Sequence, residues 1–99
     1  MTLHTVSELL SNNNILPEVE IKGWVRTFRA NRFIALNDGS TINNIQCVVD
    51  FEKTDETILK RITTGAAVHI KGELVESQGK GQKVEIIVKS IVILGDSDP

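Results

Sequence analysis

Residues 19–40 read VEIKGWVRTFRANRFIALNDGS and carry the clearest structural pattern in the chain. Apolar and polar side chains alternate over Val19–Arg26 and again over Phe33–Leu36, which is typical of half-buried strands. Gly23 indicates a bulge or a sharp bend within the first strand. The sequence Asn37–Ser40 is a strong turn signal that ends the second strand. The stretch therefore predicts two consecutive strands, the first of which bends.

Three further strands follow along the chain. They are expected over Ile45–Phe51, Ala67–Glu76 and Val84–Leu94, and the last of these is dense in β-branched residues. The segment between the last two strands, Ser77–Gln82, is rich in glycine and is expected to be a mobile loop.

Two short helices accompany the strands. The first is expected over Leu3–Asn14, with an apolar stripe formed by Val6, Leu9 and Leu10. The second follows the third strand, with Thr54 as its expected N-cap and with Asp55 and Glu56 in its first turn. Its apolar face consists of Ile58, Leu59 and Ile62.

The order of elements is helix, three strands, helix and two strands, and this order matches the OB-fold. We expect an all-β domain with accessory helices: a five-stranded Greek-key OB-fold barrel, a short N-terminal helix, and a helix between strands three and four. Residues 1–17 are expected to form the N-terminal helix and lead-in, residues 18–95 the barrel, and residues 96–99 the start of a hinge. An open α+β sandwich is the competing architecture.

Length and composition exclude several classes of protein. The 99 residues leave room for one domain with one core. No apolar run approaches the ~20 residues that span a bilayer, and the N-terminus lacks the pattern of a secretory signal. The single cysteine, Cys47, cannot form an internal disulfide or a thiolate metal site. We therefore expect a cytoplasmic protein with no metal site and no membrane partner.

The distribution of charge is uneven along the chain. The net charge of −2 argues against a strongly basic nucleic-acid binder. Residues 21–37, however, carry four basic side chains and no acidic one, so they contribute +4 and the other 82 residues contribute −6. The same strip holds Trp24, Phe28 and Phe33, three of the four aromatic residues. Basic side chains interleaved with aromatic ones suit single-stranded nucleic acid, because cations pair with phosphates and rings stack on bases.

Strand alternation sorts the candidate binding residues by face. Ile34 must face the core, so Phe33 faces outward. The same alternation places Gln46 and Glu85 on the outer side of the third and fifth strands. OB-fold strands lie in the order 1-2-3-5-4, so these side chains and Arg29, at the end of the first strand, share one outer face. That face binds oligonucleotides in this fold.

Other basic and aromatic residues give weaker signals. Arg26 adds a cation to the basic strip, and Lys80 and Lys83 beside the glycine-rich loop could reach a phosphate backbone. Trp24 is expected in the core, whereas the pattern leaves Phe28 open between a core role and a binding role.

Three motifs resemble the anticodon-binding domain of class II aminoacyl-tRNA synthetases, in the subgroup that serves Asp, Asn and Lys. They are GWVRTFR at residues 23–29, FIALNDGS at 33–40 and IQCV at 45–48. The resemblance extends from about Val19 to Leu94. It implies an N-terminal OB-fold that binds tRNA and reads its anticodon loop, including a middle uridine. It also implies that Arg29, Phe33 and Gln46 read this uridine. Glu85 would contact another anticodon base.

Within this subgroup the chain is most similar to bacterial-type asparaginyl-tRNA synthetases. An aspartyl pattern would have an acidic residue at Ala35 and an arginine at Asn37. The resemblance implies a homodimeric parent that attaches asparagine to tRNA with ATP and Mg²⁺. The ATP-binding motifs of the family are absent from these residues. We therefore expect a non-catalytic part of a longer ligase, with no cofactor of its own. A monomeric state of the isolated domain is compatible with this expectation.

Three alternatives remain open on the sequence. The chain could be the anticodon-binding domain of an aspartyl- or lysyl-tRNA synthetase. It could be a stand-alone single-stranded nucleic-acid-binding OB domain, which equal affinity for any short oligonucleotide and a steep salt dependence would favour. It could also be a barrel that binds protein or sugar, which an absence of RNA binding at low salt would favour. A free-standing enzyme is disfavoured, because the sequence holds no nucleophile–base pair and no phosphate-cradling motif.

Overall fold

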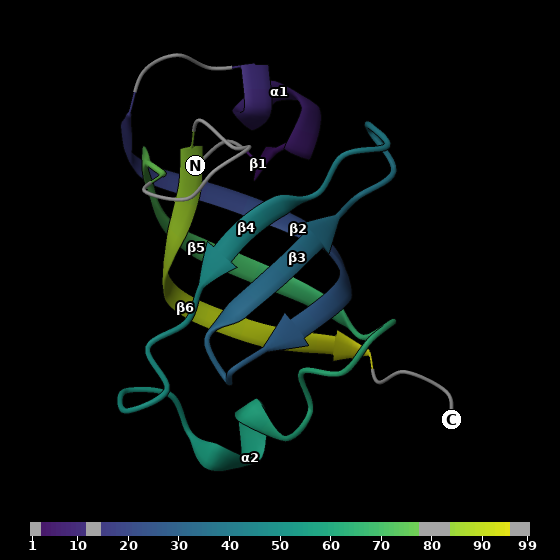
Figure 1. Cartoon of the computed structure of the whole chain (residues 1–99), viewed down its shortest axis with the longest axis vertical. Coiled ribbons are helices and arrows are strands. Elements are labelled where there is room, and N and C mark those ends of the chain that lie inside the picture. Colours follow the sequence, from purple (N-terminus) through teal and green to yellow (C-terminus); the bar gives the residue numbers. More distant parts are fainter. Residues whose placement is uncertain (1–2, 12–14, 78–83, 96–99) are drawn as a thin grey trace.

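The computed structural model describes residues 3–11, 15–77 and 84–95 and shows a closed sheet with two short helices (Figure 1). The strands are β1 (Leu3–His4), β2 (Leu16–Arg29), β3 (Phe33–Asn37), β4 (Ile45–Val48), β5 (Ala67–Glu76) and β6 (Val84–Gly95). The helices are α1 (Val6–Ser11) and α2 (Glu56–Leu59). The strand order is β1-β2-β3-β4-β6-β5, and pairing of β2 with β5 closes the sheet. The expected five-stranded barrel is confirmed, with the two-residue β1 added in parallel beside β2.

The long strand β2 contributes to both halves of the barrel. Residues 16–24 pair with β5 and residues 24–29 pair with β3, both antiparallel. The register with β3 shifts between Val25 and Thr27, so the irregularity lies at Arg26. The sequence predicted it at Gly23 instead. Gly23 has another role, because a Cβ there would lie 2.5 Å from the carbonyl oxygen of Asn37. Glycine therefore allows β2 and β3 to approach each other closely.

The core is built from the inward-facing side chains of β2 to β6 and one face of α1. Its largest fully buried side chains include Leu9, Ile21, Ile34, Leu36, Ile45, Ile70, Leu74 and Ile86. The helix expected from Leu3 begins only at Val6, because Leu3 and His4 pair with β2 instead. Residues 12–14 of that expected helix lie outside the described residues.

The segment after β4 departs from the sequence prediction. The strand expected to reach Phe51 ends at Val48, and Phe51 is 47% exposed rather than on the core face. A turn follows, in which the Lys53 N–H donates to the carbonyl oxygen of Asp50 at 3.1 Å. Strand alternation therefore stops before Phe51.

The N-cap of α2 also differs from the prediction. Asp55 takes this position, and its side chain accepts a hydrogen bond from the backbone N–H of Thr57 at 2.9 Å. The hydroxyl of Thr54, the residue expected to cap the helix, donates instead to the carbonyl oxygen of Asp50 at 2.8 Å. A carboxylate at this position is at least as good a cap as a threonine hydroxyl.

The turn after β3 fixes the start of α1. Asp38 Oδ2 accepts from the Val6 N–H at 3.0 Å, and the Ser40 hydroxyl accepts from the Ser7 N–H at 2.9 Å. The first N–H groups of a helix have no partner within it, so these contacts satisfy two of them. The turn that ends a strand thus also holds the N-terminal helix on the barrel.

Asp38 should make the stability of the fold depend on pH. Burial raises the pKa of Asp38, but hydrogen bonds from the side chain and N–H of Ser40 and from the Val6 N–H outweigh burial, so its pKa lies below the usual value of an aspartate. A carboxyl group with a lowered folded-state pKa stabilises the protein above its unfolded-state pKa, and this contribution disappears as the pH falls through the folded-state pKa. Between about pH 5 and pH 3, Asp38→Asn should lose less stability than the unchanged protein in urea unfolding. Parallel stability–pH curves for the two proteins would contradict this role.

Candidate nucleic-acid interface

The strand registers align a first row of side chains across β2, β3, β4 and β6. Arg29 lies opposite Phe33, and Phe33 lies opposite Val48 on β4. Val48 in turn pairs with Ile87 on β6. Because paired residues in a sheet point to the same side, Arg29, Phe33, Val48 and Ile87 share one face.

A second row lies beside the first. Thr27 pairs with Ala35, and Ala35 pairs with Gln46. The parallel register of β4 and β6 aligns Gln46 with Glu85, one residue before the paired Cys47 and Ile86. The two rows together form the outer face of the barrel. The structure therefore brings Arg29, Phe33, Gln46 and Glu85 onto one face, as alternation predicted.

Phe33 presents a partly exposed ring in the middle of the first row. The Arg32 guanidinium lies over this ring, 6.0 Å from its centroid, which is within the range of a cation–π contact. Arg29 is exposed and lies directly across from Phe33 on β2. A flat ring with two arginines as neighbours can stack on a base while the cations meet its phosphates. Arg32 belongs to the basic strip of residues 21–37, but strand alternation alone gave no reason to choose it as a binding residue.

Gln46 and Glu85 form a fixed polar pair in the second row. Gln46 Nε2 donates to Glu85 Oε2 at 2.9 Å, although the two residues are 39 positions apart in the sequence. Glu85 is only 8% exposed, so this carboxylate has little freedom to turn away. The pair holds an amide and a carboxylate in one orientation on the outer face.

The remaining predicted residues have different outcomes. Arg26 lies at the irregularity of β2 and is exposed. Lys80 and Lys83 lie outside the described residues. Phe28 pairs with Ile34 and packs against the core, which decides the choice that the sequence left open.

The expected core position of Trp24 is wrong. Trp24 is 39% exposed, because Val25 next to it is fully buried and alternation turns Trp24 outward. Its indole ring packs against the turn after β3, where its Cη2 atom would lie 3.4 Å from a Cβ built on Gly39.

Cys47 and the possible metal-ligating side chains lie apart from the outer face or from one another in the described part of the chain. Cys47 is fully buried, and burial raises the pKa of its thiol, so it stays protonated and unreactive. Among residues 3–11, 15–77 and 84–95, no three His, Cys, Asp or Glu side chains gather closely enough to hold a metal ion. No helix within these ranges is long and apolar enough to cross a membrane.

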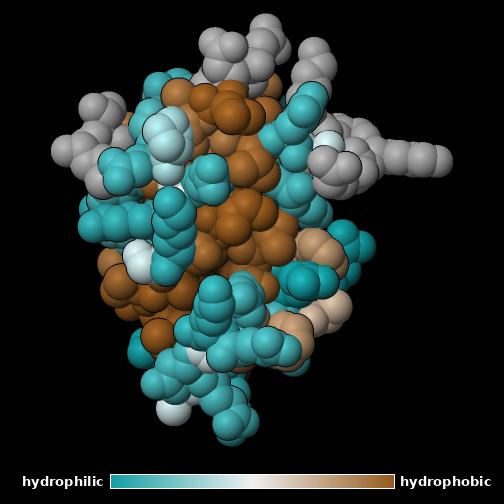
Figure 2. Space-filling model, turned by 90° about the vertical axis from the view of Figure 1, so that its left-hand side faces the viewer, coloured by the Kyte–Doolittle hydropathy of each residue, from teal (hydrophilic) through white to brown (hydrophobic). Residues whose placement is uncertain are grey.

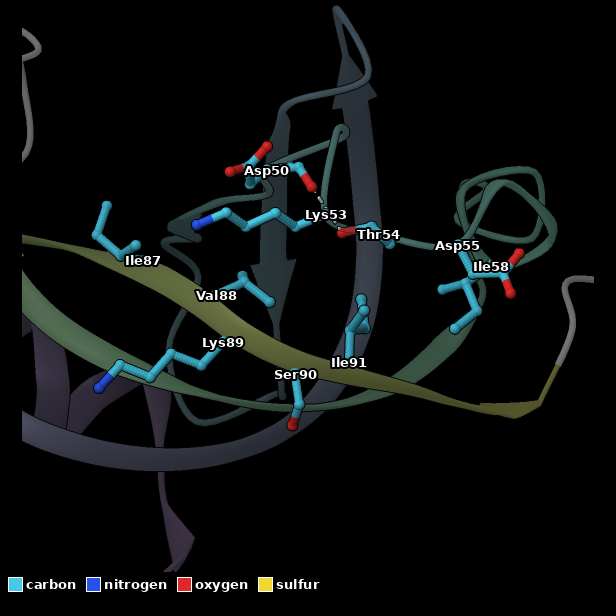
Figure 3. A pocket seen from close by; sticks show the side chains of 10 residues that line it. All are labelled: Asp50, Lys53, Thr54, Asp55, Ile58, Ile87, Val88, Lys89, Ser90 and Ile91. Carbon is cyan, nitrogen blue, oxygen red and sulfur yellow. Dashed lines mark hydrogen bonds between the residues drawn. The ribbon is translucent and has the colours of Figure 1, made fainter.

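A pocket borders the outer face where β6 separates from β4. It lies between β6 and the connection from β4 to α2 and has a volume of ≈ 520 Å³ (Figure 3). Its lining includes Ile87 of the first row, the apolar Val88 and Ile91, and the basic Lys53 and Lys89. Figure 2 views the molecule from the left of Figure 1, the side where β6 begins, and shows a hydrophobic band flanked by hydrophilic side chains.

Comparison with known proteins relates the sequence to one group. Residues 19–94 match the family model for an OB-fold nucleic acid binding domain of the tRNA anti-codon type. The chain is 50% identical over 97 residues to an asparagine–tRNA ligase from Parabacteroides distasonis. This match covers 95% of the chain but 21% of the ligase, so the chain spans about a fifth of the length of the curated relatives it matches.

Solved structures share the architecture. An asparaginyl-tRNA synthetase from Entamoeba histolytica, in complex with asparaginyl-adenylate, matches with a TM-score of 0.68 at 26% identity, over 82% of this chain and 21% of that one. An asparaginyl-tRNA synthetase from Pyrococcus horikoshii, also complexed with asparaginyl-adenylate, gives a TM-score of 0.78 at 16% identity, over 99% of this chain and 23% of that one. The second match supports the fold alone.

Proposed function

The chain belongs to the OB-fold nucleic acid binding domain family and is homologous to the N-terminal region of asparagine–tRNA ligases, and from this we propose that its outer face reads a tRNA anticodon loop. One observation carries the proposal: the registers align an aromatic ring, a guanidinium, an amide and a carboxylate on four adjoining strands. Unpaired bases of an RNA loop are recognised by such stacking and edge contacts.

Phe33 and Arg29 hold the middle base of the anticodon. The ring of Phe33 stacks on this base, a contact of about 1–3 kcal/mol. Arg29, directly across the strand pair, contacts the edge of the base or a neighbouring phosphate. Arg26, Lys80 and Lys83 bind the phosphate backbone, which adds affinity without sequence information.

Gln46 selects uridine at the middle position, and Glu85 fixes how it does so. Because Gln46 Nε2 donates to Glu85, the amide oxygen points away from the carboxylate. Uracil presents an N–H donor beside carbonyl acceptors, which an amide oxygen and its second N–H can meet. Cytosine has an acceptor at the same ring nitrogen. To donate to this acceptor, the Gln46 amide would have to turn over, which would bring its oxygen against the Glu85 carboxylate. The second carboxylate oxygen of Glu85 contacts a neighbouring anticodon base.

The domain supplies recognition within a longer ligase. That ligase attaches asparagine to tRNA with ATP and Mg²⁺, and this chain corresponds to about a fifth of its length. The ligase is cytoplasmic and homodimeric. The 50% identity to asparagine–tRNA ligases over 95% of the chain favours this parent over an aspartyl or lysyl one.

Gln46 and Glu85 can be tested with RNA hairpins that differ only at the middle base of a seven-nucleotide loop. The unchanged domain should bind the uridine hairpin about tenfold more tightly than the cytidine hairpin. Gln46→Ala should remove most of this preference. Glu85→Gln should reduce the preference without abolishing binding, because residue 85 could then donate to the amide oxygen and let the amide turn over. Titration of fluorescently labelled hairpins measures each affinity.

A domain that binds the two hairpins equally would contradict base selection and favour a sequence-tolerant binder. Lys22→Ala is the control. Lys22 is exposed, and its backbone lies opposite His69 of β5, on the β2–β5 side of the barrel. It should leave the preference unchanged.

A further inference from the structure

We propose that the pocket beside β6 binds one further nucleotide of the RNA loop, adjoining the anticodon triplet. This inference rests on the function proposed above and extends the interface past the first row. The nucleotide would place the face of its base on the apolar lining of the pocket and its phosphate between Lys53 and Lys89.

The pocket exists because β6 continues after β4 has ended. The parallel pairing of the two strands covers only Cys47 with Ile86 and Val48 with Ile87. Beyond Ile87, β6 has no further strand partner on this side within the described ranges. The chain from Asp50 to α2 does not pair with β6 there but lines the opposite side of the pocket. The resulting space of ≈ 520 Å³ lies within the range of about 300–1,000 Å³ of small-molecule sites.

The pocket is continuous with the outer face. Ile87 belongs both to the first row and to the pocket lining, and it is 37% exposed. Phe33 lies two strands away in the same row, which corresponds to about 10 Å at the usual strand spacing. A loop whose middle base stacks on Phe33 therefore passes within reach of the pocket.

The side chains that line the pocket suit a nucleotide. Val88, Ile91 and Ile58 provide apolar contacts for a base. Lys53 and Lys89 are exposed, and in Figure 3 both side chains extend toward the Ile87 end of the pocket, next to the outer face. Neither lysine takes part in an ion pair with another described residue. Two lysines that form no ion pair with a described carboxylate, beside an apolar lining, favour a phosphate with an attached base.

The acidic side chains at the rim have other partners. Asp50 Oδ1 accepts from the Glu52 N–H at 3.0 Å, and Asp55 Oδ1 accepts from the N–H and the hydroxyl of Thr57 at 2.9 and 2.8 Å. These contacts orient both carboxylates toward nearby N–H and hydroxyl groups, and Lys53 and Lys89 are the cationic groups of the lining that can meet a phosphate.

The test uses the 99-residue chain and hairpins with a seven-nucleotide loop that keep the triplet with its middle uridine. In two further hairpins, the nucleotide on the 5′ or the 3′ side of the triplet is abasic. One of these abasic hairpins should bind the unchanged protein roughly five- to tenfold more weakly than the intact hairpin. The double variant Lys53→Gln/Lys89→Gln should lose a similar factor on the intact hairpin. Combining the variant with that abasic hairpin should cost little more than either change alone, because both remove the same contact.

The matched control is Lys22→Gln/Lys71→Gln, which removes the same charge from exposed positions on β2 and β5. Equal affinities for the intact hairpin in the two double variants, or no effect of an abasic site on either side, would overturn the pocket while leaving the outer face intact. Failure of the anticodon proposal looks different: the unchanged protein would not bind even the intact hairpin, and the pocket proposal would fall with it.

Discussion

Replacing Phe33 by alanine should weaken binding of an anticodon hairpin by about 1–3 kcal/mol, roughly five- to 150-fold in Kd. The ring is the only aromatic side chain in the two rows of the outer face; Arg32 lies over it, and Arg29 is opposite Phe33 on β2. Without the ring, the middle base has no flat surface on which to stack, and the two cations lose the contact that places the loop between them. Equilibrium titration of a labelled hairpin measures the loss.

Two further variants separate stacking from stability, because Phe33 is partly buried. Phe33→Leu keeps most of the apolar contact with the barrel but cannot stack as a ring, so it should fold normally and still bind weakly. Phe51→Ala removes the same side chain from a position that is 47% exposed and lies outside the outer face, so it should bind normally. Full affinity in both Phe33 variants would exclude stacking on this ring as the source of binding.

Replacing Gly72 by alanine should destabilise the barrel by about 3 kcal/mol. A Cβ at this position would lie 2.2 Å from the carbonyl oxygen of Ile87 and 2.9 Å from Cγ2 of Ile86. The first neighbour is a backbone atom of β6, which cannot move aside as the end of a flexible side chain can. Relief would require β5 and β6 to separate where their register already shifts. Urea unfolding should show a lower midpoint than for the unchanged protein.

The matched control for this substitution is Gly95→Ala at the end of β6. Nothing lies within 4 Å of a Cβ at Gly95, so its effect should stay within about 0.5 kcal/mol. Equal unfolding midpoints for the two alanine variants would show that the close approach of β6 to Gly72 does not determine the stability of the barrel. Because β6 also carries Glu85 and Ile87, any Gly72→Ala protein that still folds should bind RNA more weakly.

Much of the barrel could be predicted because strand alternation is local. The predicted bounds Ala67–Glu76 coincide with β5, and Ile34 and Leu36 are fully buried as expected. Each of these strands has one face against the core, so the positions of its apolar residues indicate to which side each neighbouring side chain points. Adding the strand order of the fold to this alternation was enough to place Arg29 and Phe33 on the same face.

Features that depend on a distant partner could not be predicted. The irregularity at Arg26 depends on the register of β2 against β3, which no residue of β2 encodes by itself. The bond between Gln46 and Glu85 requires the parallel register of β4 and β6. Phe51 was misplaced because the strand ends three residues before it. The pocket could not be anticipated, because it arises from the early separation of two strands.

The outward position of Trp24 gives the domain an optical probe of its own. Trp24 is the only tryptophan and the chain has no tyrosine, so one indole accounts for nearly all of its near-ultraviolet fluorescence. This indole packs on the turn that holds α1. Its strand partner Asn37 lies two residues beyond Ala35, so Trp24 also occupies the row next to that of Gln46. The emission of this one residue should therefore change both when the barrel unfolds and when RNA binds, without any added label.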